Sequence, residues 1–171
     1  RNVLRDSDRV RYHNVSLLNP AAPRNAQMNH LGDLYVHLID HAQVELRRVF
    51  SLLAEQNGHA ALFHCAAGKD RTGVVAALLL ELAGVPHETI AEDYALTASC
   101  IVPIMDELRS DRPAGVPAEV YETMLACDPA HMRHMLSHLE SQYGGSERYL
   151  QAIGVPDAAL QALKDRFTME I

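Results

Sequence analysis

The sequence lacks tryptophan and has only three cysteines among its 171 residues. An odd number of cysteines, in a chain long enough to bury a core without cross-links, does not form a disulfide framework. Cys65, Cys100 and Cys127 therefore favour a reducing compartment, and a structural role is the default for Cys100 and Cys127. The alternative is a disulfide between one of these two and an oxidised Cys65, as protection of that thiol.

Long apolar runs and basic clusters are also missing. The longest apolar run, Val74 to Leu80, is far shorter than the ~20 residues needed to cross a bilayer. The net charge of -7 argues against binding to nucleic acid or to an acidic membrane surface, so local charge must hold any anionic substrate. No leader sequence opens the chain, yet it begins with Arg1 rather than Met, and we expect a cut or engineered N-terminus. Both a cytoplasmic and a secreted protein fit this sequence, and it specifies no oligomeric state.

The hydrophobic pattern predicts a single domain over residues 1–171. Segments 10–18 and 60–64 are predicted strands, and apolar residues at helical spacing predict one long helix from Leu31 to Leu53 that stops before Asn57-Gly58. The segment Thr72 to Ala83 is apolar nearly all round, which predicts a buried helix. Further helices are predicted at 87–98, 101–110, 117–126, 129–143, 146–153 and 157–168.

This order of elements predicts an α/β fold, in which helices wrap a central, mostly parallel sheet and dominate the C-terminal half. Two strands are few for a sheet that supports so many helices. We therefore expect that further N-terminal strands preceded Arg1 and were truncated.

The segment from His64 to Gly73 carries the chemistry. A loop between a strand and a helix can direct backbone N–H groups and the helix N-terminus at one anion, which also lowers the pKa of the thiol of Cys65. Arg71 can grip two phosphoryl oxygens, and the Thr72 hydroxyl can stabilise the sulfur as a leaving group. The remaining positions are predicted to shape the loop and bind substrate: His64, Ala66, Ala67, Gly68, Lys69 and Gly73.

Two alternatives for this segment fit less well. A nucleotide-binding P-loop needs glycine where the chain has Phe63 and Ser or Thr where it has Asp70. A buried structural cysteine would leave Lys69, Asp70 and Arg71 unexplained. The segment predicts a phosphatase with a cysteine nucleophile, which needs no metal or other cofactor.

The motif from His64 to Gly73 resembles that of the protein tyrosine phosphatase superfamily, in particular a bacterial branch that includes a secreted mycobacterial enzyme. Gly84-Val85-Pro86, the segment 93–97 and the segment 143–150 are similar to further features of that branch. The resemblance implies an α/β fold, a phosphocysteine on Cys65 and phosphate binding by Arg71. An Asp-Leu-Arg segment expected in an early strand is absent, which we attribute to truncation.

The resemblance leaves the general acid open. Many tyrosine phosphatases use a mobile Trp-Pro-Asp loop, but this chain has no tryptophan and its one Pro-Asp pair, Pro156-Asp157, is typical of a helix start. Asp70 is the first candidate, because phosphoinositide phosphatases of the myotubularin type similarly carry an aspartate just before the loop arginine. It could instead orient Arg71. Asp93 is the alternative acid, while Asp33 is interpreted as a charge at a helix N-terminus.

Several weaker signals are ordinary in helical proteins. His131, His134 and His138 share a helical face and His37 with His41 has a spacing found in zinc sites, but neither set has companion ligands. Solvated faces or hydrogen bonds account for them better. A group of apolar residues could form a lid over the site or simply pack between helices: Met124, Leu125, Met132, Met135 and Leu136.

The predicted substrate is phosphotyrosine protein, with phosphoinositide as the second choice. Lys69 is expected to contribute to substrate binding, as by neutralising a second phosphate. Two further classes stay open: a sulfurtransferase like rhodanese, which would carry a persulfide on Cys65, and an inactive module that binds phosphate without turnover.

Overall fold

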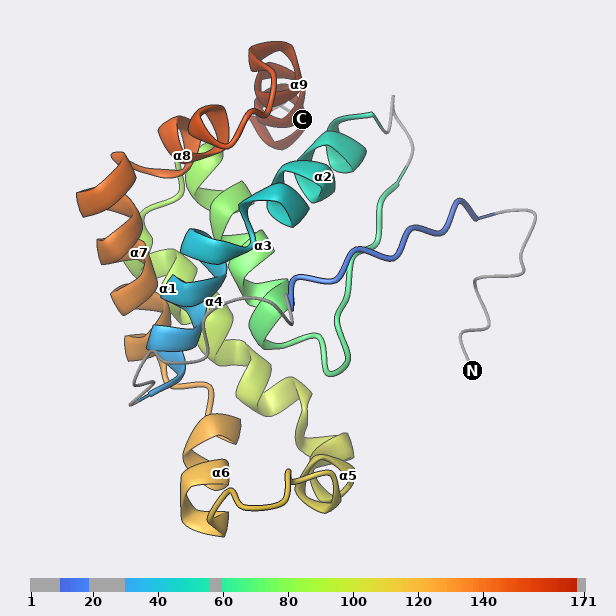
Figure 1. Ribbon diagram of the computed structural model, residues 1–171, viewed down its shortest axis with the longest axis vertical. Helices are drawn as coiled ribbons and strands as arrows, with labels where there is room; N and C mark the ends of the chain where they lie inside the picture. Colours follow the sequence, from blue (N-terminus) through green and yellow to red (C-terminus); the bar gives the residue numbers. More distant parts are fainter. Residues whose placement is uncertain (1–9, 19–29, 56–59, 169–171) are drawn as a thin grey trace.

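The computed structural model describes residues 10–18, 30–55 and 60–168 of the chain. These residues are helical except for two extended segments and the connecting loops (Figure 1). The helices follow in the order α1 (Leu31–His41), α2 (Gln43–Ala54), α3 (Asp70–Leu82), α4 (His87–Cys100), η1 (Val102–Ile104), α5 (Met105–Ser110), α6 (Ala118–Leu125), α7 (Pro129–Tyr143), α8 (Ser146–Ala152) and α9 (Asp157–Thr168).

The predicted α/β fold is wrong for the described part of the chain, because the segments 10–18 and 60–64 are extended but form no sheet there. A strand is stabilised by a ladder of backbone hydrogen bonds to a neighbouring strand, and neither segment has such a partner among the described residues. The side chain of Leu62 is 81% exposed, whereas Leu17 and Phe63 pack against the helices. The apolar composition therefore marked segments that contact the core, but it could not show whether they pair.

The predicted helix from Leu31 to Leu53 is divided at Ala42 into α1 and α2. Ala42 leaves the helical conformation, with φ -107° and ψ 29°, while its N–H still donates to the carbonyl of Leu38 at 3.0 Å. Leu38, Ala42 and Leu46 are all buried, so the apolar periodicity continues across the break and does not reveal it. The break lets α1 pack on α7 while α2 packs on α9.

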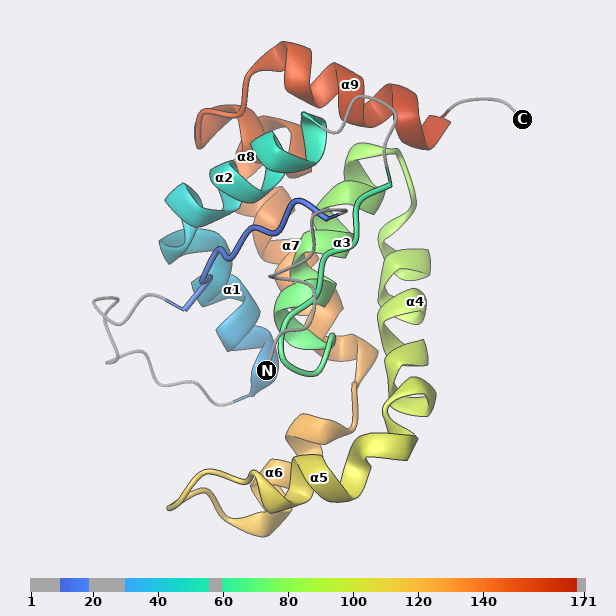
Figure 2. The same cartoon turned by 90° about the vertical axis from the view of Figure 1, so that its right-hand side faces the viewer.

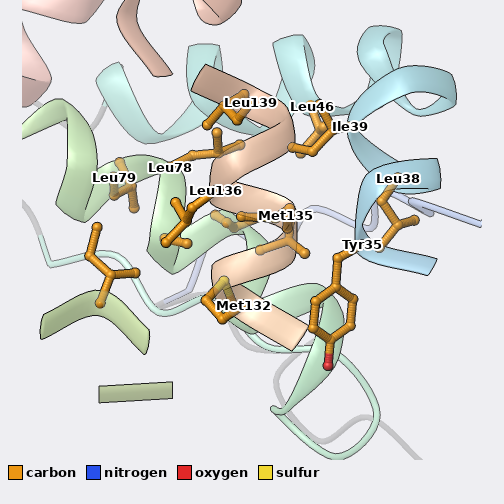
Figure 3. Packing of buried hydrophobic residues seen from close by; sticks show 14 of the residues in the cluster. Tyr35, Leu38, Ile39, Leu46, Leu78, Leu79, Met132, Met135, Leu136 and Leu139 are labelled. Atoms are coloured by element: carbon orange, nitrogen blue, oxygen red, sulfur yellow. The ribbon is translucent and has the colours of Figure 1, made fainter. Parts of the chain in front are cut away.

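The predicted buried helix is confirmed as α3, which begins two residues earlier than expected, at Asp70. It contacts α1, α4 and α8, and its central residues are among the most buried of the described chain. The core around it joins side chains from α1, α2, α3 and α7, including Tyr35, Leu46, Leu78, Met135 and Leu139 (Figure 3). This packing fixes the end of α3 that carries the loop.

The C-terminal helices fall close to their predicted bounds. The short helices α5 and α6 lie beside each other at one end of the molecule, below α3 and α7 (Figure 2). Arg109 pairs with Glu122 at 2.8 Å, and the Tyr121 hydroxyl donates to the Leu108 carbonyl at 2.9 Å. These contacts hold the two short helices together.

Candidate active site

The loop from Cys65 to Lys69 joins the extended segment 60–64 to α3. Gly68 adopts φ +69°, a conformation that residues with a side chain rarely take, and a Cβ there would meet no atom within 4 Å. Backbone conformation, rather than space, thus requires glycine at this position. The turn brings the first residue of α3, Asp70, directly after the loop and places the helix N-terminus beside it.

Cys65 is partly buried at the start of this loop. Burial raises the pKa of its thiol, but four opposing contributions outweigh burial and lower the pKa below its ordinary value. They are the Thr72 hydroxyl near the sulfur, the backbone N–H groups of Thr72 and Lys69, and the positive charge of Arg71. The surroundings of Cys65 therefore favour the thiolate, which is the nucleophilic form.

Thr72 and Arg71 have polar groups that the described residues leave largely unused. Thr72 Oγ1 is buried and meets no partner with regular hydrogen-bond geometry among those residues, so its hydroxyl is available to the sulfur. The Arg71 side chain is half-buried and forms no hydrogen bond or ion pair within the described segments. Its guanidinium is thus available to an anion in the loop.

His64 supports the loop from the other end. Its ring Nδ1 donates to the carbonyl of Cys65 at 2.8 Å, while the side chain stays exposed. This contact orients the peptide that follows the nucleophile. The predicted loop positions Ala66 and Ala67 lie between Cys65 and Gly68, where their backbone N–H groups belong to the same turn.

The side chain of Lys69 is buried and bound by the protein, whereas contact with a second phosphate requires an exposed ammonium group. Its side chain is only 3% exposed, and Nζ donates to Asp70 Oδ1 at 2.8 Å and to the Met124 carbonyl at 2.6 Å. The ammonium group therefore connects the loop to α6. A role in substrate binding stays a prediction, and the observed contacts favour an anchoring role.

Asp70 is held by neighbours on its Oδ1 oxygen. Besides Lys69, the hydroxyl of Tyr35 donates to Oδ1 at 2.5 Å, and Tyr35 in turn contacts the hydroxyl of Tyr94 at 2.6 Å. The side chain of Asp70 is 32% exposed, which leaves Oδ2 as the oxygen toward solvent. One carboxylate oxygen of Asp70 is thus engaged by the protein, while the other has no partner among the described residues.

The two tyrosines of this network are not indicated by the sequence motif. In the sequence, Tyr35 belongs to the apolar face of a helix, and Tyr94 lies in the segment 93–97, whose resemblance gives it no role. Burial raises the pKa of both phenols, so they stay protonated donors. One feature of the sequence could have indicated Tyr35: it is a tyrosine on an otherwise aliphatic helix face. A buried phenol needs a hydrogen-bond partner, so such a tyrosine points to a polar contact in the core.

Gly73 allows α4 to approach the loop. A Cβ at this position would lie 3.1 Å from Cδ2 of Tyr94, closer than side-chain carbons ordinarily pack. The predicted loop glycine therefore acts in the first turn of α3, where it makes room for the Tyr94 ring. A side chain at this position would press on the ring of Tyr94, which contacts Tyr35.

Asp93, the alternative acid, lies exposed on α4. It borders a pocket of about 150 Å³ between α3 and α4 that Gly68, Lys69 and Thr72 also line. The structure thus brings Asp93 to the same pocket as part of the loop, but no described residue hydrogen-bonds its carboxylate. Asp70 and Asp93 therefore differ in how firmly the protein fixes them.

The hydrogen bond of His138 agrees with the sequence interpretation, whereas His134 belongs to a group that the sequence does not predict. Within the described ranges, one group of three possible metal ligands comes together: His30, Asp33 and His134, with ligand atoms within 4.8 Å of one another. His138 instead hydrogen-bonds Asp40 at 2.9 Å, and the neighbouring rings of His37 and His41 have no third ligand in that part of the chain. Asp33 therefore lies beside His134 as a possible third ligand. The sequence indicates Asp33 only as a charge at a helix N-terminus.

The other two cysteines and the methionines also have clear positions. Cys100 is exposed and Cys127 buried, and both are free thiols.

Met132, Met135 and Leu136 are fully buried between α7 and its neighbours (Figure 3), which confirms the packing interpretation for them. No helix in the described segments has the length and apolar character that a membrane span requires.

Comparison with known proteins extends the resemblance to most of the chain. A sequence model described as "Tyrosine phosphatase family" matches residues 3–169. A tyrosine-protein phosphatase of Nostoc commune is 38% identical over 179 aligned positions, which cover 96% of this chain and 60% of that protein. The "Triple specificity protein phosphatase PtpB" of Mycobacterium tuberculosis is 30% identical, over 72% of this chain and 48% of that protein. The chain therefore spans between about half and three fifths of the length of these two relatives.

Proposed function

Because the chain belongs to the tyrosine phosphatase family, we propose that it hydrolyses phosphomonoesters with Cys65 as the nucleophile. The observation that carries this proposal is the surroundings of Cys65. Its thiol pKa is lowered, despite partial burial, by N–H and hydroxyl donors and by Arg71. A stable thiolate beside convergent donors is the requirement for attack on a phosphoryl group.

In the first step, Cys65 Sγ attacks phosphorus while the bond from phosphorus to the ester oxygen breaks. Arg71 and the loop N–H groups bind the phosphoryl oxygens. A proton on Asp70 Oδ2 passes to the departing oxygen, so that the product leaves as an alcohol or phenol. The result is a phosphocysteine and an ionised Asp70.

In the second step, a water molecule attacks the phosphocysteine and gives its proton to Asp70. The bond between sulfur and phosphorus breaks, inorganic phosphate is released and Cys65 returns as a thiolate. The Thr72 hydroxyl donates to the sulfur as its negative charge develops. The cycle restores the proton on Asp70 and requires no cofactor.

Phosphotyrosine protein is the first proposed substrate, because two relatives carry tyrosine or protein phosphatase names. The name of the mycobacterial relative includes triple specificity, which keeps further phosphoesters, among them phosphoinositides, as the second candidate for this chain. Release of phosphate from a phosphotyrosine peptide and from an inositol phospholipid in mixed micelles would rank the two.

A Cys65→Ser variant tests the proposed mechanism. We expect loss of phosphate release by at least about 10,000-fold, because a serine hydroxyl at this site is not ionised. Binding of a phosphotyrosine peptide, measured by calorimetry, should persist, because the other loop donors are unchanged. A Cys100→Ser variant is the matched control and should keep full activity.

Three results would contradict the proposal. Hydrolysis that survives Cys65→Ser would exclude the phosphocysteine. Binding of phosphopeptide by the unmodified chain without turnover would favour the inactive module. Persulfide on Cys65 with formation of thiocyanate would favour the sulfurtransferase.

A further inference from the structure

A chain of hydroxyl groups connects three helices behind the loop. Tyr94 lies on α4, Tyr35 on α1 and Asp70 at the start of α3, and successive contacts measure 2.6 and 2.5 Å. We infer that Tyr35, supported by Tyr94, is a positioning residue that holds Asp70 so that Oδ2 delivers the proton to the leaving group. The inference rests on the proposed function and adds the residues that orient its acid.

The direction of the hydrogen bonds follows from counting protons. A phenol has one hydroxyl proton, and that of Tyr35 is used on Asp70 Oδ1. In the contact between the two tyrosines, Tyr94 must therefore donate and Tyr35 must accept. The order of donation is Tyr94 to Tyr35 to Asp70, and it holds whether Oδ2 carries a proton or not.

The burial of the tyrosines makes this arrangement rigid. Tyr35 is fully buried and Tyr94 is 4% exposed, so water does not replace either hydroxyl as a donor. Figure 3 shows the Tyr35 ring at the edge of the apolar cluster with its oxygen pointing away from the aliphatic side chains. The packed ring fixes the oxygen in space, and the carboxylate bound to it cannot rotate without breaking the part-buried hydrogen bond from Tyr35.

Lys69 and Tyr35 together select one oxygen of Asp70. Both donate to Oδ1, from the loop and from α1 respectively. Since no described residue holds Oδ2, it is the oxygen that can exchange a proton with a substrate. The network therefore fixes the orientation of Asp70, whereas Asp93 has no comparable support among the described residues.

Tyr149 provides a matched control for Tyr35. It is likewise fully buried, and its hydroxyl donates to a backbone carbonyl, that of Ile39, at 2.7 Å. This hydrogen bond lies within the core and involves neither the loop nor Asp70. A Tyr149→Phe variant therefore removes a buried hydroxyl and its hydrogen bond without touching the proposed acid.

The test compares two aryl phosphates whose leaving groups differ in their need for a proton. Phenol is a poor leaving group and needs protonation, whereas p-nitrophenolate leaves as an anion. Tyr35→Phe should lower kcat/KM for phenyl phosphate about tenfold and kcat/KM for p-nitrophenyl phosphate by less than about twofold, since tenfold corresponds to one hydrogen bond to a charged group. The ratio kcat/KM is the readout because it reports the transfer to Cys65, whereas kcat also includes the hydrolysis of the phosphocysteine that both substrates share. Tyr149→Phe should change both substrates by the same small factor.

A double variant makes the test specific to Asp70. In an Asp70→Asn background the acid is gone, so Tyr35→Phe should cause no further loss on phenyl phosphate. Tyr94→Phe removes the second donor and should show the same substrate dependence with a smaller loss. If circular dichroism shows that Tyr35→Phe does not fold, the Tyr94→Phe variant replaces it in the test.

Two outcomes would overturn the inference. Equal losses on both substrates in folded Tyr35→Phe, as in Tyr149→Phe, would assign the tyrosine a structural role only. A loss on phenyl phosphate that persists in full in the Asp70→Asn background would show that Tyr35 acts elsewhere. Failure of the proposed function would look different, because the unmodified chain would then release no phosphate that depends on Cys65.

Discussion

The two sides of the loop before α3 differ in how their polar groups are satisfied. On one side, the side chains of Thr72 and Arg71, which face Cys65, have no regular hydrogen bond within the described residues. On the other side, Lys69 and one oxygen of Asp70 are engaged with Tyr35 and the Met124 carbonyl. A folded chain rarely leaves buried polar atoms without partners. The unpaired groups are therefore interpreted as binding a ligand, and the paired groups as holding the loop in place.

Neighbouring residues of the motif from His64 to Gly73 thus have different surroundings, which the sequence alone does not indicate. Lys69, Asp70 and Arg71 are consecutive and charged, yet the first is buried, the second is shared between protein and solvent, and the third has no partner in the described segments. The turn at Gly68 and the start of α3 thus give neighbouring side chains different partners. Substitutions on the two sides should therefore produce different kinds of defect.

The largest effect is expected on the side that awaits the ligand. Arg71→Lys should lower kcat/KM for a phosphotyrosine peptide by about 100-fold to 1,000-fold, because lysine keeps the charge but loses the planar, two-pronged grip on the phosphoryl oxygens. Stability should be nearly unchanged, since Arg71 forms no hydrogen bond with the described residues. Steady-state kinetics and a thermal melt measure the two quantities.

Arg133→Lys is the matched control for that substitution. Arg133 lies exposed on α7 and forms an ion pair with Glu88, away from the loop. We expect unchanged kinetics for this variant. Retention of activity in Arg71→Lys would contradict the assignment of Arg71 to the ligand side.

The sequence predicted the family and the helix behind the loop better than the contacts around the loop. The motif from His64 to Gly73 predicted a tyrosine phosphatase, which the family match confirms, and the apolar run predicted α3. The division of α1 from α2 at Ala42 left no local signal, because the same apolar face continues across it. The contact of Tyr35 with Asp70 joins residues 35 positions apart, and only packing of α1 against α3 produces it.

A substitution on the anchoring side should affect stability and every substrate alike. Lys69→Met keeps the volume of the side chain but removes its hydrogen bonds to Asp70 and Met124. The free energy of unfolding should fall by about 2 kcal/mol, the usual cost of losing hydrogen bonds to a buried charged group. Phosphotyrosine and phosphoinositide hydrolysis should fall by similar factors, because the loop loses its connection to α6.

Lys164→Met controls for the loss of a lysine. Lys164 pairs with Glu147 near the surface, and its replacement should change stability by less than about 0.5 kcal/mol. Denaturant unfolding and parallel assays on both substrates provide the comparison. A loss in Lys69→Met that is confined to the phosphoinositide would instead support a contact between Lys69 and a second phosphate.

The smallest effect is expected from the single hydroxyl of Thr72, on the ligand side. Thr72→Val keeps the shape but removes the hydroxyl that lowers the pKa of Cys65, so the thiol pKa should rise toward its ordinary value. The thiolate then requires a higher pH: alkylation of Cys65 by iodoacetamide should slow at mildly acidic pH and recover above the ordinary thiol pKa. Subtracting the rate of a Cys65→Ser variant removes the contribution of exposed Cys100. Thr123→Val, which removes an exposed hydroxyl on α6, should leave the profile unchanged, and an unchanged profile in Thr72→Val would contradict the role given to this hydroxyl.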